Sequence, residues 1–222
     1  MLHHKGKEED PSKKDSRMRI VVVRHGQDEH GYRGGWSQRG LTEEGKMQSQ
    51  LLAKHLSNSW QPLKFLISSD LRRARETAEY ISQEMELPIH SSPLWREMNN
   101  GELAGMPNSL AEQLYPGLFA SSLEMDEPYP HGESPRQFFQ RITHAFEGLC
   151  EKMITLQISS EIIVVTHGGV ITILSYFLNG SVWSNKEPAI PTNAASIHEI
   201  SYQEGKWLFT TQNHIDHLSI KG

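Results

Sequence analysis

Two histidines stand directly after short runs of β-branched residues. His25 closes the segment RIVVVRH at 19–25, and His167 closes the segment EIIVVTH at 161–167. Runs of this kind are typical of strands that are buried on both faces of a parallel sheet. Ligand crevices of open α/β sheets lie at the carboxyl ends of such strands, so we expect both imidazoles to reach one crevice.

Arginines accompany these histidines. Arg24 precedes His25, and Arg72 and Arg73 fall in the first turn of a helix expected after another short strand at 65–68. Arginines, histidines and helix N-termini together attract a group with two negative charges, such as a phosphate monoester. A neutral imidazole can attack phosphorus in line while the other groups neutralise the equatorial oxygens. This chemistry requires no metal, and we predict no cofactor.

The leaving alcohol needs a proton, and Glu97 is the best candidate to supply it. Glu97 lies in the segment LWREM at 94–98, where crowding against Trp95 and an apolar wall would raise the pKa of its carboxyl group. Asp28, Glu29 and Glu102 are weaker candidates for the same role.

Each of these residues can also be explained without a catalytic or binding role. The tripeptide Arg-His-Gly arises often by chance, and His167 could simply end a strand-to-helix turn. Gly168 and Gly169 favour instead a close approach of the backbone to a ligand. Arg73 could belong to a solvated helical face with local ion pairs, so its function depends on convergence with the histidines.

Two further pairs of histidines do not predict a metal site. His214 and His217 have the spacing His-x-x-His, but no third ligand of matching geometry accompanies them. His3 and His4 lie in a charged segment, MLHHKGKEEDPSKKDSR, that has too few apolar side chains to order itself.

The elements that would position the catalytic groups alternate between strands and helices. Thr42 begins a helix of roughly four turns, and Ser69 or Asp70 is expected to cap the helix that runs to Met85. The segment from about 94 to 131 is irregular, with a short helix near 109–114, and such an insert in a compact domain is usually functional.

The second half of the chain continues the alternation. Ser134, Pro135 and Gln137 fit a capping box at the start of a helix that reaches Met153. A strand at 161–166, an apolar helix at 170–178 and two late strands near 196–202 and 206–211 follow. We predict an α/β fold, a three-layer α/β/α sandwich with a mainly parallel central sheet. A flexible tail at 1–17 precedes a single domain at 18–222 that carries an irregular, cap-like insert at about 94–131.

Composition limits the partners and the location. The chain has 222 residues and a formal net charge of -5, without a basic stripe for nucleic acid. It has one cysteine and no apolar stretch long enough for a membrane span or a signal peptide, so we expect a cytoplasmic protein with neither a nucleic acid nor a membrane partner. The sequence leaves the oligomeric state open, and a homodimer is compatible with it.

Seven segments in order resemble the histidine phosphatase superfamily, branch 1, which has the phosphoglycerate mutase-like fold. They are VVVRHGQ, GLTEEG, ISSDLRRARETA, LWREMNNGELAGMP, HGESPRQFFQRI, IIVVTHGGV and NHIDHL. The resemblance implies that His25 accepts the phosphoryl group and that Glu97 donates the proton. It also implies that Arg24, Arg73 and His167 bind the phosphate. Arg73 is preferred over Arg72 because the family pattern places its arginine directly before the alanine.

The sequence departs from the family just after His25. Members often have Glu-Thr after RHG and, a few residues later, an asparagine that contacts phosphate, whereas this chain reads QDEHG at 27–31. Gln27 is expected to line the entrance, Gly168 to contact the phosphate, and Arg33 to substitute for the missing contact. What replaces the asparagine is not fixed by the sequence.

The segment after Glu97 is shorter and less basic than in the glycolytic mutases that resemble this family. We therefore predict a metal-independent phosphomonoesterase that forms a phosphohistidine intermediate and acts on a small phosphorylated metabolite. Phosphoglycerate mutase-type transfer and a catalytically weak regulator that binds a phosphorylated ligand are the alternatives. The natural substrate does not follow from the sequence.

Overall fold

One mixed sheet organises the protein. A computed structural model describes residues 18–59, 63–158 and 161–219, so the predicted tail at 1–17 lies outside the described residues. Within them, six strands form a sheet in the order β3-β2-β4-β1-β5-β6. Their bounds are β1 Arg19–Arg24, β2 Leu63–Ser69, β3 Ile89–Ser92, β4 Glu161–Thr166, β5 Ile197–Gln203 and β6 Lys206–His214.

The strands that carry the predicted histidines are neighbours. β1 pairs in parallel with β4, with Val23 opposite Val165 and Arg24 opposite Thr166. β2 is parallel to β4 and to β3, whereas β5 runs antiparallel to β1 and to β6. The residues after β1 and after β4 therefore leave the sheet side by side.

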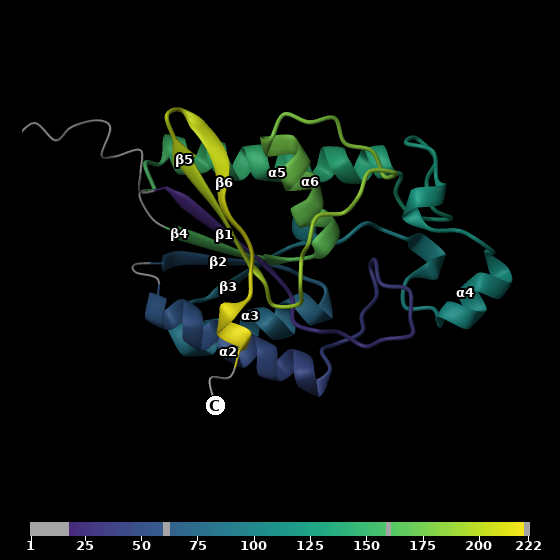
Figure 1. The fold of residues 1–222 in the computed structure, drawn as a ribbon, viewed down its shortest axis with the longest axis horizontal. Coiled ribbons are helices and arrows are strands. Elements are labelled where there is room, and N and C mark those ends of the chain that lie inside the picture. The colour runs from purple at the N-terminus through teal and green to yellow at the C-terminus, as the bar shows by residue number, and fades with distance from the viewer. Residues whose placement is uncertain (1–17, 60–62, 159–160, 220–222) are drawn as a thin grey trace, which may run out of the picture.

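Helices cover both faces of the sheet. Figure 1 shows α2 (Glu43–Ser59) and α3 (Arg72–Met85) on one face, and α5 (Pro135–Thr155) and α6 (Gly168–Leu178) on the other. Alternate residues of β1 face the two layers: Ile20 and Val22 belong to one buried cluster, and Val21 and Val23 belong to the other. This arrangement confirms the predicted three-layer α/β/α fold. In the described parts of the chain, no helix is long and apolar enough to cross a bilayer.

The start predicted for α5 is confirmed, whereas the cap predicted for α3 is not. The Ser134 side chain accepts from the backbone of Gln137, whose side chain accepts from the backbone of Ser134, as a capping box requires. The cap predicted for α3 was wrong, because its N-cap is Leu71 and no side chain caps it. Ser69 Oγ accepts from the N–H of Leu71 at 3.3 Å and also contacts His167, while Asp70 pairs with Arg96.

The insert at about 94–131 consists of short helices joined by loops. They are the 3-10 turns η1 (Pro93–Trp95), η2 (Gly101–Leu103) and η3 (Ala120–Ser122), and the helix α4 (Asn108–Leu114). α4 contains the predicted short helix. Two backbone hydrogen bonds join the insert to the loop after β1: Arg33 N–H donates to Met106 at 2.8 Å, and Gly105 N–H donates to Arg33 at 2.9 Å. A last 3-10 turn, η4 (Asp216–Leu218), follows β6.

Candidate active site

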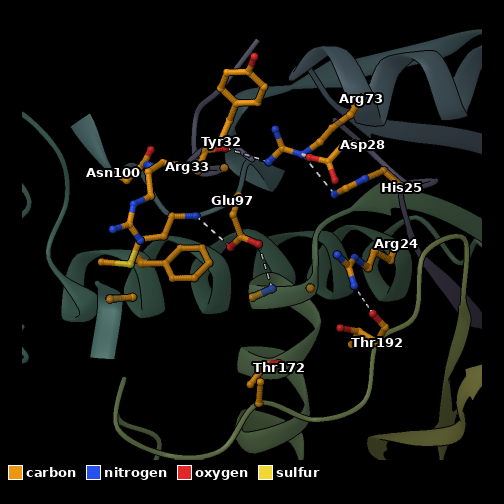
Figure 2. Close-up of a pocket in the computed structure, with 18 of the residues that line it drawn as sticks. Arg24, His25, Asp28, Tyr32, Arg33, Arg73, Glu97, Asn100, Thr172 and Thr192 are labelled. Atoms are coloured by element: carbon orange, nitrogen blue, oxygen red, sulfur yellow. Dashed lines mark hydrogen bonds and ion pairs between the residues drawn. The ribbon is translucent and has the colours of Figure 1, made fainter. Parts of the chain in front are cut away.

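A cavity of about 760 Å³ opens where β1 and β4 end. His25, Arg24 and Arg73 line it, together with Glu97 and Gly168. Figure 2 shows these groups arriving from separate parts of the chain, with Arg73 and His25 on one side and Glu97 near the centre. Arg73 therefore converges with the histidine nucleophile, as its predicted function requires.

The hydrogen bond made by the His25 ring fixes its tautomer. Its Nδ1 lies 2.7 Å from the carbonyl oxygen of Gly26, which can only accept, so Nδ1 carries the hydrogen. The lone pair is then on Nε2. Burial lowers the pKa of His25 well below its usual range, and the charges of Arg73 and Arg24 lower it further. A neutral imidazole with an available lone pair is the form that can attack phosphorus.

Arg73 is fixed beside this lone pair. Its Nε lies 3.2 Å from Nε2 of His25, and its side chain is 3% exposed. Nη2 donates to the carbonyl of Gly35 at 2.8 Å and Nη1 to that of Ser37 at 3.1 Å. The neighbouring Arg72 is exposed and pairs with Glu76. Of these two arginines, only Arg73 lies in the cavity.

Arg24 approaches from the end of β1. Its Nη1 donates to the carbonyl of Thr192, and its buried Nε has no hydrogen-bond partner. Gly168 lies against the same loop, because a Cβ at that position would approach Thr192 Oγ1 to 2.9 Å, whereas Arg24 Nε would be at an ordinary contact distance of 3.8 Å. Thr192 lies in a loop without a recognisable motif, so it was not predicted from the sequence.

His167 lies behind His25. The two ring centroids are 5.1 Å apart, and His167 is fully buried. Its Nε2 lies 2.8 Å from Ser69 Oγ, whereas its buried Nδ1 has no partner. Burial lowers the pKa of His167 well below its usual range, with Arg73 and His25 contributing. His167 was predicted to bind the phosphate, but it is not among the residues that line the cavity, and its ring lies against that of His25 instead.

Glu97 is held by backbone groups rather than by the expected apolar wall. Its Oε1 accepts from the N–H of Met98 and its Oε2 from the N–H of Gly169, both at 3.0 Å. A Cβ at Gly169 would overlap the carboxylate, which explains why glycine stands there. Glu97 therefore bridges the insert and the first turn of α6.

Arg141 positions the segment that carries Glu97. From the middle of α5, its guanidinium donates to the carbonyls of Leu94 at 2.9 Å, Arg96 at 3.0 Å and Glu97 at 3.1 Å. Glu133 pairs with it at 2.6 Å. Trp36 adds a bond from its Nε1 to the Glu97 carbonyl at 2.7 Å. Arg141 was not predicted from the sequence, because a helical pattern does not distinguish such a residue from a solvated one.

Some of the remaining candidate residues line the cavity and others lie outside it. Gln27 does not line the cavity, and its side-chain amide instead lies 2.9 Å from His30 Nε2. Asp28 lines the cavity and lies 3.6 Å from Arg73, and Glu29 also lines it. Glu102 lies outside and accepts from the hydroxyl of Tyr115.

No metal centre is evident in the described ranges. His214 and His217 lie near His55, with ring centroids 5.2–6.0 Å apart. Across 18–59, 63–158 and 161–219, however, no group of three or more histidine, cysteine or acidic side chains is arranged to hold a metal ion.

Comparisons with known proteins show the family of the chain. The model of the histidine phosphatase superfamily (branch 1) matches residues 20–215. A probable phosphatase of Schizosaccharomyces pombe is 32% identical over 199 residues, covering 84% of this chain and 88% of the relative. A metal-independent phosphoserine phosphatase of Arabidopsis thaliana is 28% identical over 211 residues, covering 91% and 84%. The structure of YhfR from Bacillus stearothermophilus matches with a TM-score of 0.79 at 21% identity, covering 91% and 100%, which shows a shared fold.

Proposed function

Because the chain belongs to the histidine phosphatase superfamily (branch 1), we propose that it hydrolyses small phosphate monoesters through a phosphohistidine on His25, without a metal. The observation that carries this proposal is the Nε2 lone pair of a neutral, buried His25 beside Arg73 and Arg24. A phosphoryl group placed on that lone pair meets cationic donors at its equatorial oxygens, which is how phosphoryl transfer is accelerated.

The reaction proceeds in two displacements at phosphorus. In the first, Nε2 of His25 forms a bond to phosphorus while the ester P–O bond breaks, and protonated Glu97 gives its proton to the leaving alcohol. In the second, water attacks the phosphohistidine while the carboxylate of Glu97 takes a proton from that water. The P–N bond then breaks, releasing inorganic phosphate and restoring neutral His25 and protonated Glu97.

Hydrolysis is favoured over mutase transfer by the charge of the insert. Residues 94–131 contain one arginine, Arg96, and no lysine. Its Nε and Nη2 donate to the two carboxylate oxygens of Asp70, each at 2.6 Å. The insert itself therefore supplies no arginine or lysine to the cavity. The cytoplasmic location and the homodimer stay predictions.

Three measurements test this function. Hydrolysis of p-nitrophenyl phosphate should persist in EDTA and disappear in His25→Gln, and activity retained in that variant would contradict the assignment. Acid quenching during turnover of a ³²P-labelled ester should trap a phosphoenzyme, which separates an enzyme from a regulator that only binds. Incubation with 3-phosphoglycerate should release phosphate without forming 2-phosphoglycerate, and isomerisation would indicate a mutase instead.

A further inference from the structure

The cavity extends away from His25 to another arginine. Three arginines line it, and Arg24 and Arg73 lie at His25. The third, Arg33, comes from the loop between β1 and α2. Figure 2 shows the Glu97 carboxylate between Arg33 and His25, so Arg33 lies on the side of the cavity away from the nucleophile.

The guanidinium of Arg33 is largely buried, yet no carboxylate in the described part of the chain lies within hydrogen-bond distance to balance its positive charge. Its side chain is 12% exposed, and its nearest carboxylate oxygen, on Glu112, lies 3.6 Å from Nη2, which is longer than a hydrogen bond. Glu112 itself is 57% exposed and therefore well solvated. The Nε of Arg33 is buried without a hydrogen-bond partner. A buried guanidinium in this condition is a ready site for an oxyanion.

The guanidinium is also held in place before any ligand arrives. The two backbone hydrogen bonds with Met106 and Gly105 fix the main chain of Arg33 against the insert. The ring of Phe119 supports the side chain, with the guanidinium carbon 3.9 Å from the ring centroid. A cation fixed in this way loses little freedom when an anion binds.

Tyr129 adds a donor to the same region. It lines the cavity and is 7% exposed. Burial raises the pKa of Tyr129 to about 12, while the charge of Arg33 acts in the opposite direction. The hydroxyl therefore stays protonated at neutral pH and can donate a hydrogen bond to an anionic group near Arg33.

We propose that Arg33 binds a second anionic group of the substrate, so that the preferred substrates are phosphate monoesters that also carry a carboxylate or a second phosphate. This inference rests on the proposed function. It assigns the two ends of the cavity to different parts of one molecule: Arg24, Arg73 and His25 take the phosphoryl group that is transferred, and Arg33 takes the other charge. Arg33 is then a specificity residue and does not replace the missing asparagine contact to the transferred phosphate.

Matched esters test the second charge directly. 3-Phosphoglycerate and glycerol 3-phosphate differ by a carboxylate in place of a hydroxymethyl group, and fructose 1,6-bisphosphate and fructose 6-phosphate differ by a phosphate. We expect the wild type to favour the more anionic member of at least one pair in kcat/KM, and the pair it favours identifies the group. Arg33→Gln should lower that preference by about 10- to 100-fold, and Arg33→Lys should restore part of it.

Two other variants keep the test decisive. Arg75→Gln removes an exposed arginine that also has a carboxylate at 3.6 Å, on Glu79, and should leave the preference unchanged. Glu112→Gln removes the competing carboxylate and should lower KM for the more anionic ester by about 2- to 5-fold. An equal loss for both esters in Arg33→Gln, or a wild type with no preference in either pair, would overturn the inference.

Calorimetry separates this inference from the proposed function. In a His25→Gln background no ester is consumed, so the ratio of Kd values for each pair measures discrimination without turnover. A chain that discriminates through Arg33 but forms no phosphoenzyme would retain the inference and contradict the proposed hydrolysis. A chain that hydrolyses both esters without discrimination would support the proposed hydrolysis and contradict the inference about Arg33.

Discussion

The Nε–H of Arg73 donates to the lone pair of His25 Nε2 over 3.2 Å. The nitrogen that is proposed to attack phosphorus is therefore covered by an arginine donor. Arg73 stays in place through the carbonyls of Gly35 and Ser37. A phosphoryl group that enters must take over this donor, so binding and exposure of the nucleophile occur together.

Arg73→Lys should lower kcat/KM for p-nitrophenyl phosphate by about 10³-fold or more, because one ammonium cannot reproduce the fixed fork of a guanidinium. Arg72→Lys, one residue earlier and exposed, should remain within about twofold of wild type. Steady-state kinetics on both variants checks this. Comparable losses in the two would mean that Arg73 acts only through helix α3.

His25 should remain neutral in mildly acidic solution. Its pKa is lowered well below 6.5, so the neutral form that carries the Nε2 lone pair persists as the pH falls below 6.5. The ¹⁵N shifts of the imidazole, assigned with His25→Gln, should show neutral Nδ1–H tautomer at pH 5.5. Protonation of His25 with an ordinary midpoint near 6.5 would contradict the buried geometry.

Gly169→Ala should displace the Glu97 carboxylate, because the new methyl group would overlap it. We expect a much larger loss with an alkyl phosphate than with p-nitrophenyl phosphate, since nitrophenolate leaves without help from an acid. Gly148→Ala is the control, because a Cβ there meets nothing within 4 Å. That control should keep full activity and gain about 0.5–1 kcal/mol of stability in urea unfolding. Equal losses of Gly169→Ala on both esters would argue against Glu97 as the proton donor.

Arg141→Gln should act through the same proton donor. It removes the donors to the carbonyls of Leu94, Arg96 and Glu97, so Glu97 loses its alignment while the phosphate contacts stay intact. The expected result is a lower kcat, mainly for the alkyl phosphate, with little change in KM. Arg136→Gln, an exposed arginine on the same helix, serves as the control. A fall confined to thermal stability would make Arg141 merely structural.

His198 should make the protein less stable in acid. Its Nδ1 accepts from the backbone N–H of Asn213 at 3.2 Å, so protonation would set two hydrogens against each other. Burial lowers the pKa of His198 to about 4, compared with about 6.5 in the unfolded chain. The part of the folding stability that depends on neutral His198 is fully present above pH 6.5. It is lost as the pH falls toward 4 and amounts to at most about 3 kcal/mol. Urea unfolding from pH 7.5 to 4.5 should show a flatter dependence in His198→Gln than in wild type. His144→Gln, on an exposed helical face, should leave the dependence unchanged.

The sequence predicted the layers well because the signals were local. Runs such as EIIVVT and the capping box at Ser134 determine elements through neighbouring residues alone. It missed β3, whose four residues IHSS carry little hydrophobic pattern, and it misplaced the cap of α3. Asp70 pairs with Arg96, and Ser69 bonds to the backbone of Leu71 and contacts His167, so the helix begins after them without a side-chain cap.

The site residues that the sequence predicted best are those that follow a predicted strand, and Glu97 was recognised from its segment rather than from an element. His25 and His167 follow β1 and β4, so sheet topology brings them together. Arg141, Thr192 and the compartment at Arg33 depend on how a helix face or a loop packs against the insert, and no spacing encodes that. Gln27 shows the converse, because nearness to His25 in the sequence did not place its side chain in the cavity.

The position of β4 in the sheet has a consequence for how the protein acquires activity. β4 lies between β2 and β1, and its first residue, Glu161, pairs with Arg19, which lies 142 positions earlier. Loop closure over such a distance is slow and comes late in folding. Until β4 is inserted, the part of the sheet that carries His25 and the part that leads to Arg73 have no common strand. A nascent chain should therefore gain its phosphate pocket in a single late step, with no partially active intermediate before it.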